Sequence, residues 1–489
     1  MASLGFTDLP TELLDEIIQN AIPEGFRSLA LTCRVLHQLC TPFIERYNHL
    51  HSQFYDFAYT EDRWDNSLAP YKPAAFNLIR RIADEPKVAR YIRHANLDCD
   101  TYPRAWRPWN VPDIEDGGPI IELFENSPYL KEAGLDWREY YALIQEDFEQ
   151  HIYSQHAATF LLTLLPNVES LHLPKRWVST EKSDKLLSAI VRKAIAQRNA
   201  PLWNRPSLVQ LTKFTAHNAR PRCEFGLEKA IPFLALPNTR WFDCAGCLAT
   251  NGASIAIASQ DPYLSYGATL ETAHLGGLRI DVAAMADFVK HTPRLRTLAY
   301  EYWPGEEDQD WDIGQFVTAI ENEGGGFLEE LLINIWSLDK PITPGNVPMR
   351  GFQRLRTLEF TLDMVMRILA DASPQFSTCT TTETLTDQEV SKLQALTDNL
   401  VPASVSKLSL QVDHERQHDK ALQIMFADFV ARKDAWVPAL EDIYLASYSG
   451  DTSAAYKEEC LRLTTKTKEA GVVLHIGDIS GEEAIIEDL

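Results

Sequence analysis

A six-residue pattern recurs along most of this chain: an apolar residue, two variable residues, an apolar residue, one variable residue and a final apolar residue. The clear copies begin at Val168, Leu270, Leu295, Leu328, Leu355, Val405 and Leu440. Weaker copies begin at Ile92, Leu130, Leu211 and Thr239, and VVLHIG after Gly471 is a candidate for a last one. Because the fourth and sixth residues lie two apart, they share one face of an extended strand. Each copy therefore predicts a short strand with one apolar side.

Amphipathic segments separate these copies, and their apolar residues recur at helical spacing. These residues are Leu161, Leu164 and Leu165; Leu186, Leu187, Ile190 and Val191; Met285, Phe288 and Val289; Phe316, Val317 and Ile320; and Leu422, Met425, Phe426 and Phe429. Successive copies of the pattern begin 25 to 50 residues apart, which is close to the period of helix-containing leucine-rich repeats. The sequence thus predicts an α/β fold in which helical crossovers join parallel strands.

A doubly wound α/β domain also alternates strands and helices, so it is the competing interpretation. Three features favour an irregular leucine-rich-repeat-like solenoid, a horseshoe, over residues 91–477. The strands share a side-chain formula rather than continuous apolar runs. The predicted strands are not followed by a glycine-rich phosphate loop. In addition, almost 400 residues of similar units exceed one ordinary sheet.

The N-terminus carries a separate helical pattern. Leu13, Leu14, Ile17 and Ile18 form one apolar stripe, and Pro10 fits the first turn of a helix. The pattern breaks near Pro23, restarts, and ends before Pro42, which predicts two or three short helices. So small a unit buries its apolar residues poorly alone. It is either a cap on the rest of the protein or a surface for a partner.

The order of residues in this segment favours the second interpretation, a surface for a partner protein. LPTELLDEII, followed after a gap by LALTCRVLHQLCTPFIE, resembles the F-box in the version common in fungal proteins, over Asp8 to about Tyr47. Many F-boxes carry tryptophan where this chain has Leu36. The resemblance implies helix-in-groove docking to the Skp adaptor of an SCF (Skp–cullin–F-box) ubiquitin ligase, and through it to the cullin scaffold. The residues implied in adaptor binding are Leu9, Pro10, Glu12, Leu13, Leu14, Ile17, Ile18, Leu29, Leu31, Cys33 and Leu36.

In a horseshoe, the variable positions of each copy would face solvent on the concave side. Asn334 and Gln411 belong to this expected exposed set, and so do the candidates for target binding: His94, Asp98, His172, Trp241, Asp243, His274, Glu301, Glu359 and Tyr444. We expect this face to bind a protein with a basic or mixed surface, although solvated strand positions would have the same composition. Trp106 and Trp109 in TYPRAWRPW are further candidates, because tryptophan and arginine are enriched in binding hot spots. Packing of these tryptophans as a cap is the alternative.

The sequence predicts four regions. These are an F-box helical domain at 1–50, a helical connector at 51–90, the repeat region at 91–477 and an acidic tail at 478–489. Within the repeat region, residues 371–389 are rich in Ser and Thr and hold no basic residue. That composition cannot supply a core, so we expect a mobile insertion there.

Charge and composition exclude several functions. The chain has 46 basic and 69 acidic residues, a net charge of −23, which argues against binding to nucleic-acid phosphates or to anionic membranes. A continuous apolar run of about 18 residues is absent, so we expect no membrane span. The eight scattered cysteines are typical of reduced thiols, and the first residues lack a signal-peptide pattern. These features predict a protein of the cytoplasm or nucleus.

The sequence shows little sign of catalysis. Cys244 and Cys247 form a CxxC, but a structural zinc site needs four ligands, so core cysteines are the better interpretation. The chain contains neither GxSxG nor HExxH. We therefore expect no catalytic residues, metal or cofactor, and we interpret the chain as the substrate-recognition subunit of an SCF-type ligase. A scaffold that binds the Skp adaptor outside ubiquitination is the alternative, and an independent α/β enzyme is a third.

Overall fold

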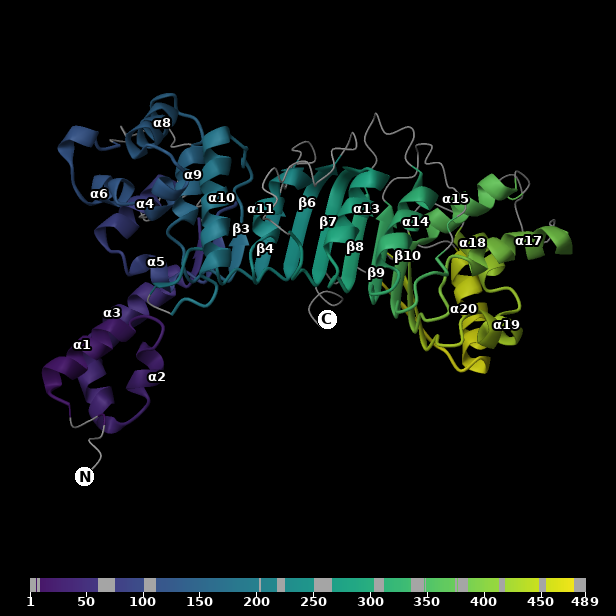
Figure 1. Ribbon diagram of the computed structural model, residues 1–489. Helices are drawn as coiled ribbons and strands as arrows, with labels where there is room; N and C mark the ends of the chain where they lie inside the picture. The colour runs from purple at the N-terminus through teal and green to yellow at the C-terminus, as the bar shows by residue number, and fades with distance from the viewer. Residues whose placement is uncertain are drawn as a thin grey trace. The chain divides into compact units, whose positions relative to one another are not determined.

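The chain is a mixed α/β protein with parallel strands, and it divides into two compact units (Figure 1). Unit 1 comprises Met1–His217 and Pro232–Arg240, and unit 2 comprises Asn218–Ile231 and Trp241–Leu489. The computed structural model describes residues 6, 9–59, 75–100, 111–201, 204–217, 225–249, 266–302, 312–335, 347, 349–373, 376, 386–412, 418–447 and 454–478. Within these residues, none of the helices combines the length and the apolar character that a bilayer crossing requires.

Unit 1 begins with three helices, drawn in purple in Figure 1: α1 (Thr11–Ala21), α2 (Phe26–Ala30) and α3 (Arg34–Phe54). Leu14, Ile18, Phe26 and Leu36 are buried between them and form a small core. Two or three helices were expected here, but the expected end before Pro42 is wrong, because α3 continues through it. Proline removes one helical hydrogen bond, yet the second half of α3 is held by the burial of Leu50 and Phe54. The helix therefore also crosses the domain boundary expected at residue 50.

The connector between the N-terminal helices and the repeats already contains the first strand. It comprises β1 (Asp56–Ala58), α4 (Ala75–Asp84) and α5 (Val88–Tyr91), and it leads into β2 (His94–Asn96). β1 pairs with β2 in parallel, β2 with β3 (Ser170–His172), and β3 with β4 (Lys213–His217). The parallel strands thus begin before residue 91, where the repeat region was expected to start.

A series of helices connects β2 to β3. Its helices are a 3₁₀ turn at Ile114–Asp116, α6 (Pro119–Glu125), α7 (Pro128–Glu132), α8 (Trp137–Glu149) and α9 (Gln155–Leu162), and α10 (Glu181–Ala196) follows β3. The strand expected from the weak copy at Leu130 is wrong, because that segment is α7. Ser127 caps α7 by accepting the Leu130 N–H, and Pro128 occupies its first turn, so local capping chemistry overrides the apolar pattern.

In unit 2, β6 to β13 follow one another in space in the order of the chain, and β5 pairs with β6. The strands are β5 (Phe225–Gly226), β6 (Trp241–Ala249), β7 (Thr272–Ile280), β8 (Thr297–Tyr302), β9 (Glu330–Ile335), β10 (Thr357–Thr361), β11 (Lys407–Val412), β12 (Asp442–Ser447) and β13 (Val473–Asp478). The helices are α13 (Val282–His291), α14 (Ile313–Gly324), α15 (Leu362–Ala372), α17 (Asp387–Asp398), α18 (His418–Met425), α19 (Phe429–Trp436) and α20 (Ala454–Glu469). A 3₁₀ turn at Leu227–Lys229 follows β5, and α11 (Ile231–Leu234) begins at the last residue of the segment Asn218–Ile231 and continues into unit 1.

The six-residue pattern predicts these strands closely. Every clear copy contains a strand that starts at its third residue, as at Thr297 in the copy that begins at Leu295. The first, fourth and sixth positions are buried, for example Leu295, Leu298 and Tyr300. Leu298 lies beside Leu331 of β9, which lies beside Leu358 of β10. The apolar positions thus form continuous rows across the strands, and they make the core.

A recurring backbone contact sets this register. The carbonyl of the second residue in a copy accepts the N–H groups of the second and third residues of the next copy. Glu329 O accepts Arg356 N at 2.7 Å and Thr357 N at 3.1 Å, and Arg356 O accepts both Ser406 N and Lys407 N at 2.9 Å. Each strand therefore starts from the same local geometry, even though the connecting segments differ in length.

Two regions expected from composition lie mostly outside the described residues. Of the Ser- and Thr-rich stretch 371–389, residues 374–375 and 377–385 are not described, and its end begins α17 through a capping box between Thr386 and Glu389. Of the acidic tail 478–489, the structure describes only Asp478, at the end of β13.

Candidate functional site

The residues implied in adaptor binding fall into three groups according to their solvent exposure. Pro10, Glu12, Leu13 and Leu31 are exposed, whereas Leu9, Ile17, Leu29 and Cys33 are half-buried. Leu14, Ile18 and Leu36 are buried in the small core, so these three are corrected from contact residues to core residues. A buried side chain reaches a partner only if the helices open, so these three residues are not accessible in this conformation.

Large apolar side chains stand exposed on this small unit. Leu13 on α1 is 47% exposed, and Leu31 at the end of α2 is 72% exposed. Val35, in the first turn of α3, is also exposed and was not selected from the sequence. Its apolar side chain next to Leu36 in the F-box-like segment was the only signal that the sequence offered for it. These three exposed apolar residues are candidates for contact with another protein.

The described candidates for target binding lie on strands of both units, except Asp98, which lies in the turn after β2. In unit 1, His94, Asp98 and His172 are half-buried, and Lys175 pairs with Asp98 at 2.7 Å. In unit 2, Trp241, Asp243, His274 and Tyr444 are half-buried, and Glu301 is exposed. Trp106 and Trp109 lie outside the described residues.

Several side chains that were expected to face solvent form a buried polar network instead. Glu359 on β10 is only 6% exposed, and Asn334 on β9 and Gln411 on β11 are buried as well. The Glu359 Oε1 atom accepts a hydrogen bond from Asn334 Nδ2 at 3.0 Å and another from Gln411 Nε2. The expectation of exposure is wrong for these three residues. Alternation along a strand determines which face a side chain occupies, but not how deeply its neighbours cover it.

Carboxylates from separate strands act on one another across this face. Although the Glu301 residue as a whole is exposed, surrounding protein atoms partly desolvate its carboxylate and raise its pKa, and the charges of Glu359 and Asp243 raise it further. None of the described lysine, arginine or histidine side chains forms an ion pair with these three acids. We call Asp243, Glu301 and Glu359 the open-face carboxylates, because they occupy the strand face opposite the apolar core.

Near β13, the same strand face carries aromatic rings and paired charges. The Lys407 Nζ atom lies 4.6 Å from the centre of the Tyr444 ring, and Tyr444 stacks on His475 with ring centres 4.2 Å apart. His475 Nε2 contacts Asp442 Oδ1 at 2.8 Å. The charges here are paired, in contrast to the open-face carboxylates.

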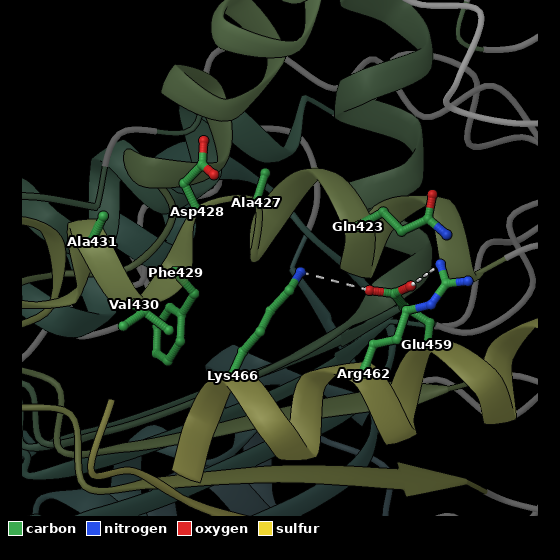
Figure 2. A pocket seen from close by; sticks show the side chains of 9 residues that line it. All are labelled: Gln423, Ala427, Asp428, Phe429, Val430, Ala431, Glu459, Arg462 and Lys466. Carbon is green, nitrogen blue, oxygen red and sulfur yellow. Dashed lines mark hydrogen bonds and ion pairs between the residues drawn. The ribbon is translucent and has the colours of Figure 1, made fainter. Parts of the chain in front are cut away.

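A pocket of about 550 Å³ lies among α18, α19 and α20 (Figure 2). Glu459 is buried between Arg462 and Lys466, with N–O distances of 3.5 and 4.0 Å, and Figure 2 shows both cations directed toward it. Lys466 Nζ also donates to the Phe426 carbonyl at 3.3 Å. The expected single helix over Leu422–Phe429 breaks here, because Asp428 adopts a left-handed conformation with φ of 50°. The pocket was not predicted, since its walls come from segments that are distant in the sequence.

Two other groupings have the residue types of catalytic sites. Asp147 Oδ2 contacts His156 Nδ1 at 3.1 Å, and His156 Nε2 lies 3.5 Å from Thr180 Oγ1. Thr180, however, caps α10 by accepting the Ser183 N–H, so its hydroxyl has a structural role. Cys244 and Cys247 are free and buried, as expected for core cysteines, and burial raises the pKa of the Cys244 thiol. Among the described residues, no group of His, Cys, Asp and Glu is placed to hold a metal ion.

Comparison with known proteins adds no family to these observations. No protein-family model matches the chain, and a search of curated proteins finds no match either.

Proposed function

We propose that this chain is the substrate-recognition subunit of an SCF-type ubiquitin ligase. The observation that carries the proposal is the N-terminal helical segment, in which a sequence similar to the F-box folds as the helices α1, α2 and α3 and leaves Leu13 and Leu31 exposed. In this assignment, α1 to α3 dock on the Skp adaptor. The strands and helices that follow form a leucine-rich-repeat-like horseshoe that holds a protein target.

The pattern of the strands supports the second half of the proposal. Copies of one six-residue unit pair in parallel, and the same bifurcated carbonyl contact recurs between most of them, as Glu329 O shows. Stacked units of this kind bury a continuous core and present a long row of side chains on the opposite face. Such a face suits recognition of a protein.

The proposed role needs no catalytic residue in this chain. A receptor that holds its target beside a charged conjugating enzyme makes the encounter of the target lysine with the reactive thioester effectively intramolecular. The rate then depends on how long the target stays bound and on whether its lysines reach the enzyme.

The docking contact would follow helix-in-groove recognition. Leu13 and Leu31 are the apolar anchors, and Pro10 and Glu12 lie beside Leu13 at the exposed start of α1. Because anchors of this kind carry most of the binding energy of an interface, removing both should weaken adaptor binding by about 100-fold.

The test is a pull-down of the Skp adaptor and cullin with the full chain, compared with the double variant Leu13→Asp/Leu31→Asp. Leu461→Asp is the matched control, because Leu461 on α20 is 69% exposed but lies far along the chain. We expect the double variant to lose both partners and the control to keep them. Adaptor binding that survives in a folded double variant would contradict the assignment. Recovery of adaptor without cullin would indicate a scaffold that acts outside ubiquitination.

A further inference from the structure

The open-face carboxylates are an unusual feature of unit 2, because three acids act on the same region without a basic partner among the described residues. Asp243 lies on β6, Glu301 on β8 and Glu359 on β10. Asn334 on β9 lies level with Glu301 and donates its Nδ2 to Glu359, so Glu301 and Glu359 lie on either side of one residue. The charges of Glu359 and Asp243 both raise the pKa of Glu301. Like charges held together in this way destabilise the free protein, and a bound cation would relieve the repulsion.

Neutral acceptors around Glu359 are also left without partners. Thr361 is 6% exposed, and its buried Oγ1 atom makes no hydrogen bond. Thr361 shares the face of Glu359, because the two residues are two positions apart on β10. Asn334, which donates its Nδ2 to Glu359, is 4% exposed, and its buried Oδ1 atom is likewise unpaired. Buried acceptors are normally satisfied, so these two point to a donor that the described part of the chain does not supply.

We propose that this set binds basic side chains of a protein segment. A lysine ammonium carries three N–H donors and an arginine guanidinium five, and neither accepts a hydrogen bond. The exposed Glu301 carboxylate offers the opposite charge at the surface. The Glu359 carboxylate, the Asn334 amide oxygen and the Thr361 hydroxyl offer further acceptors behind it, which a basic side chain reaches once the side chains that cover them move aside. Glu359 is fixed in place by Asn334 and Gln411, so its orientation does not have to be established on binding.

The spacing of the acids favours a polypeptide over a single small cation. β6, β8 and β10 are each two strands apart, which corresponds to about 9 to 10 Å between successive carboxylate-bearing strands. An extended polyproline-type segment advances about 9 Å in three residues and returns every third side chain to the same side. The register sets Asp243 and Glu359 level with Ala299, whereas Glu301 lies two residues, about 6 to 7 Å, further along β8. A segment with basic residues at every third position therefore matches the spacing of the strands, and the length of the arginine side chain covers the offset of Glu301.

This inference deepens the proposed function, because the segment would belong to the ligase target. Its binding chemistry does not depend on the adaptor, and it can be measured with the full chain alone. The probe is a fluorescein-labelled peptide with arginine at every third position, compared with the same peptide carrying glutamine in place of arginine, by fluorescence anisotropy at physiological salt.

We expect the arginine peptide to bind and the glutamine peptide not to bind. Glu301→Gln and Glu359→Gln should each weaken binding about tenfold, because each removes a charged acceptor. The matched control is Glu330→Gln, which removes one acid from β9 on the same face and leaves the open-face carboxylates intact. The control should change affinity less than about twofold. Glutamine at 359 keeps the oxygen that accepts from Asn334, so the variant retains the fold, which circular dichroism verifies.

Several results would overturn the inference. Equal weakening by Glu330→Gln would indicate general attraction to an acidic protein, and failure of the folded full chain to bind the arginine peptide would remove the site. Displacement of the peptide by equimolar spermine or by Mg²⁺ would assign the site to a small cation instead. Loss of peptide binding with adaptor binding intact would contradict only this site. Peptide binding without adaptor binding would contradict only the ligase assignment.

Discussion

Glu24 and Arg90 form a bidentate ion pair that fixes the N-terminal helices to the start of the strands within unit 1. Arg90 Nε donates to Glu24 Oε1 at 2.9 Å, and Arg90 Nη2 donates to Glu24 Oε2 at 2.6 Å. Asn167, which precedes β3, donates its Nδ2 to Glu24 at 2.6 Å and to the Arg90 carbonyl at 2.8 Å. Three segments that are far apart in the sequence, the α1–α2 connection, α5 and the approach to β3, therefore converge on one carboxylate.

Replacing this carboxylate should loosen the N-terminal helices. In Glu24→Gln, the Arg90 guanidinium loses its counter-charge in a site where the Glu24 side chain is 7% exposed. We expect a loss of about 2 kcal/mol in the free energy of unfolding, because the partner is left largely desolvated. Chemical denaturation followed by circular dichroism measures it. Glu16→Gln, an exposed acid on α1, is the control, and equal effects of both changes would contradict a specific role for the pair.

Adjacent leucines on α1 should behave in opposite ways. Leu14 is buried between the N-terminal helices, whereas Leu13 is exposed. Leu14→Ala should lower the free energy of unfolding by about 3 kcal/mol through the lost burial and the cavity. Leu13→Ala should change it by less than about 0.5 kcal/mol. Thermal unfolding of the two variants provides the comparison, and a larger loss for Leu13→Ala would mean that the helices pack differently.

Adjacent glycines on β7 offer a second matched pair. Gly277 has a φ of 104°, and a Cβ atom there would lie 2.8 Å from Gly246 N, at the irregular pairing of β6 with β7. A Cβ on Gly276 would meet nothing closer than 3.9 Å. Gly277→Ala should therefore destabilise the protein by about 2 kcal/mol or more, and Gly276→Ala by less than about 1 kcal/mol. Denaturant unfolding curves distinguish the two, and equal curves would contradict the close approach of Gly246 and Gly277.

The strands could be predicted from the sequence, because their signal is local. In LRTLEF, the buried Leu355, Leu358 and Phe360 occupy the first, fourth and sixth positions, and the strand begins at Thr357. The failed copy at Leu130 shows the limit of this pattern. The six-residue pattern considers only apolar positions, whereas Ser127 and Pro128 favour the start of a helix. The segment therefore folds as α7. Similarly, tertiary packing holds α3 through Pro42.

The candidate sites were less predictable, because they depend on neighbours that are distant in the chain. The pattern placed Glu359 on the open face, but its burial depends on Asn334 and Gln411, which reach it from the two adjacent strands. Leu13 and Leu14 have the same apolar character in the sequence, and only the packing of α1 on α2 and α3 separates exposed from buried. The pocket beside Glu459 requires helices that begin at His418, Phe429 and Ala454 to meet.

Asp100 should make the stability of the protein depend on pH. It is buried, and its Oδ1 atom accepts the Ala75 N–H at 3.0 Å, while its Oδ2 atom has no partner. Burial raises the pKa of this carboxyl from its ordinary value of 3.8 to about 8, and the hydroxyl groups of Tyr59 and Tyr153, also buried and unpaired, lie within its electrostatic reach. Near neutral pH the folded protein therefore keeps a proton that the unfolded chain releases.

The sign of the effect follows from this difference in bound protons. Between pH 4 and pH 8 the folded state binds more protons at Asp100 than the unfolded state, so rising pH lowers the free energy of unfolding, and the loss levels off above pH 8. Asp100→Asn keeps the acceptor for Ala75 N–H and cannot ionise. It should therefore remove the fall in the free energy of unfolding with rising pH, and at pH 9 the variant should be more stable than the natural chain. Denaturant midpoints from pH 5 to 9 measure it, with exposed Asp116→Asn as control. A slope that persists in Asp100→Asn would assign the pH dependence to another group.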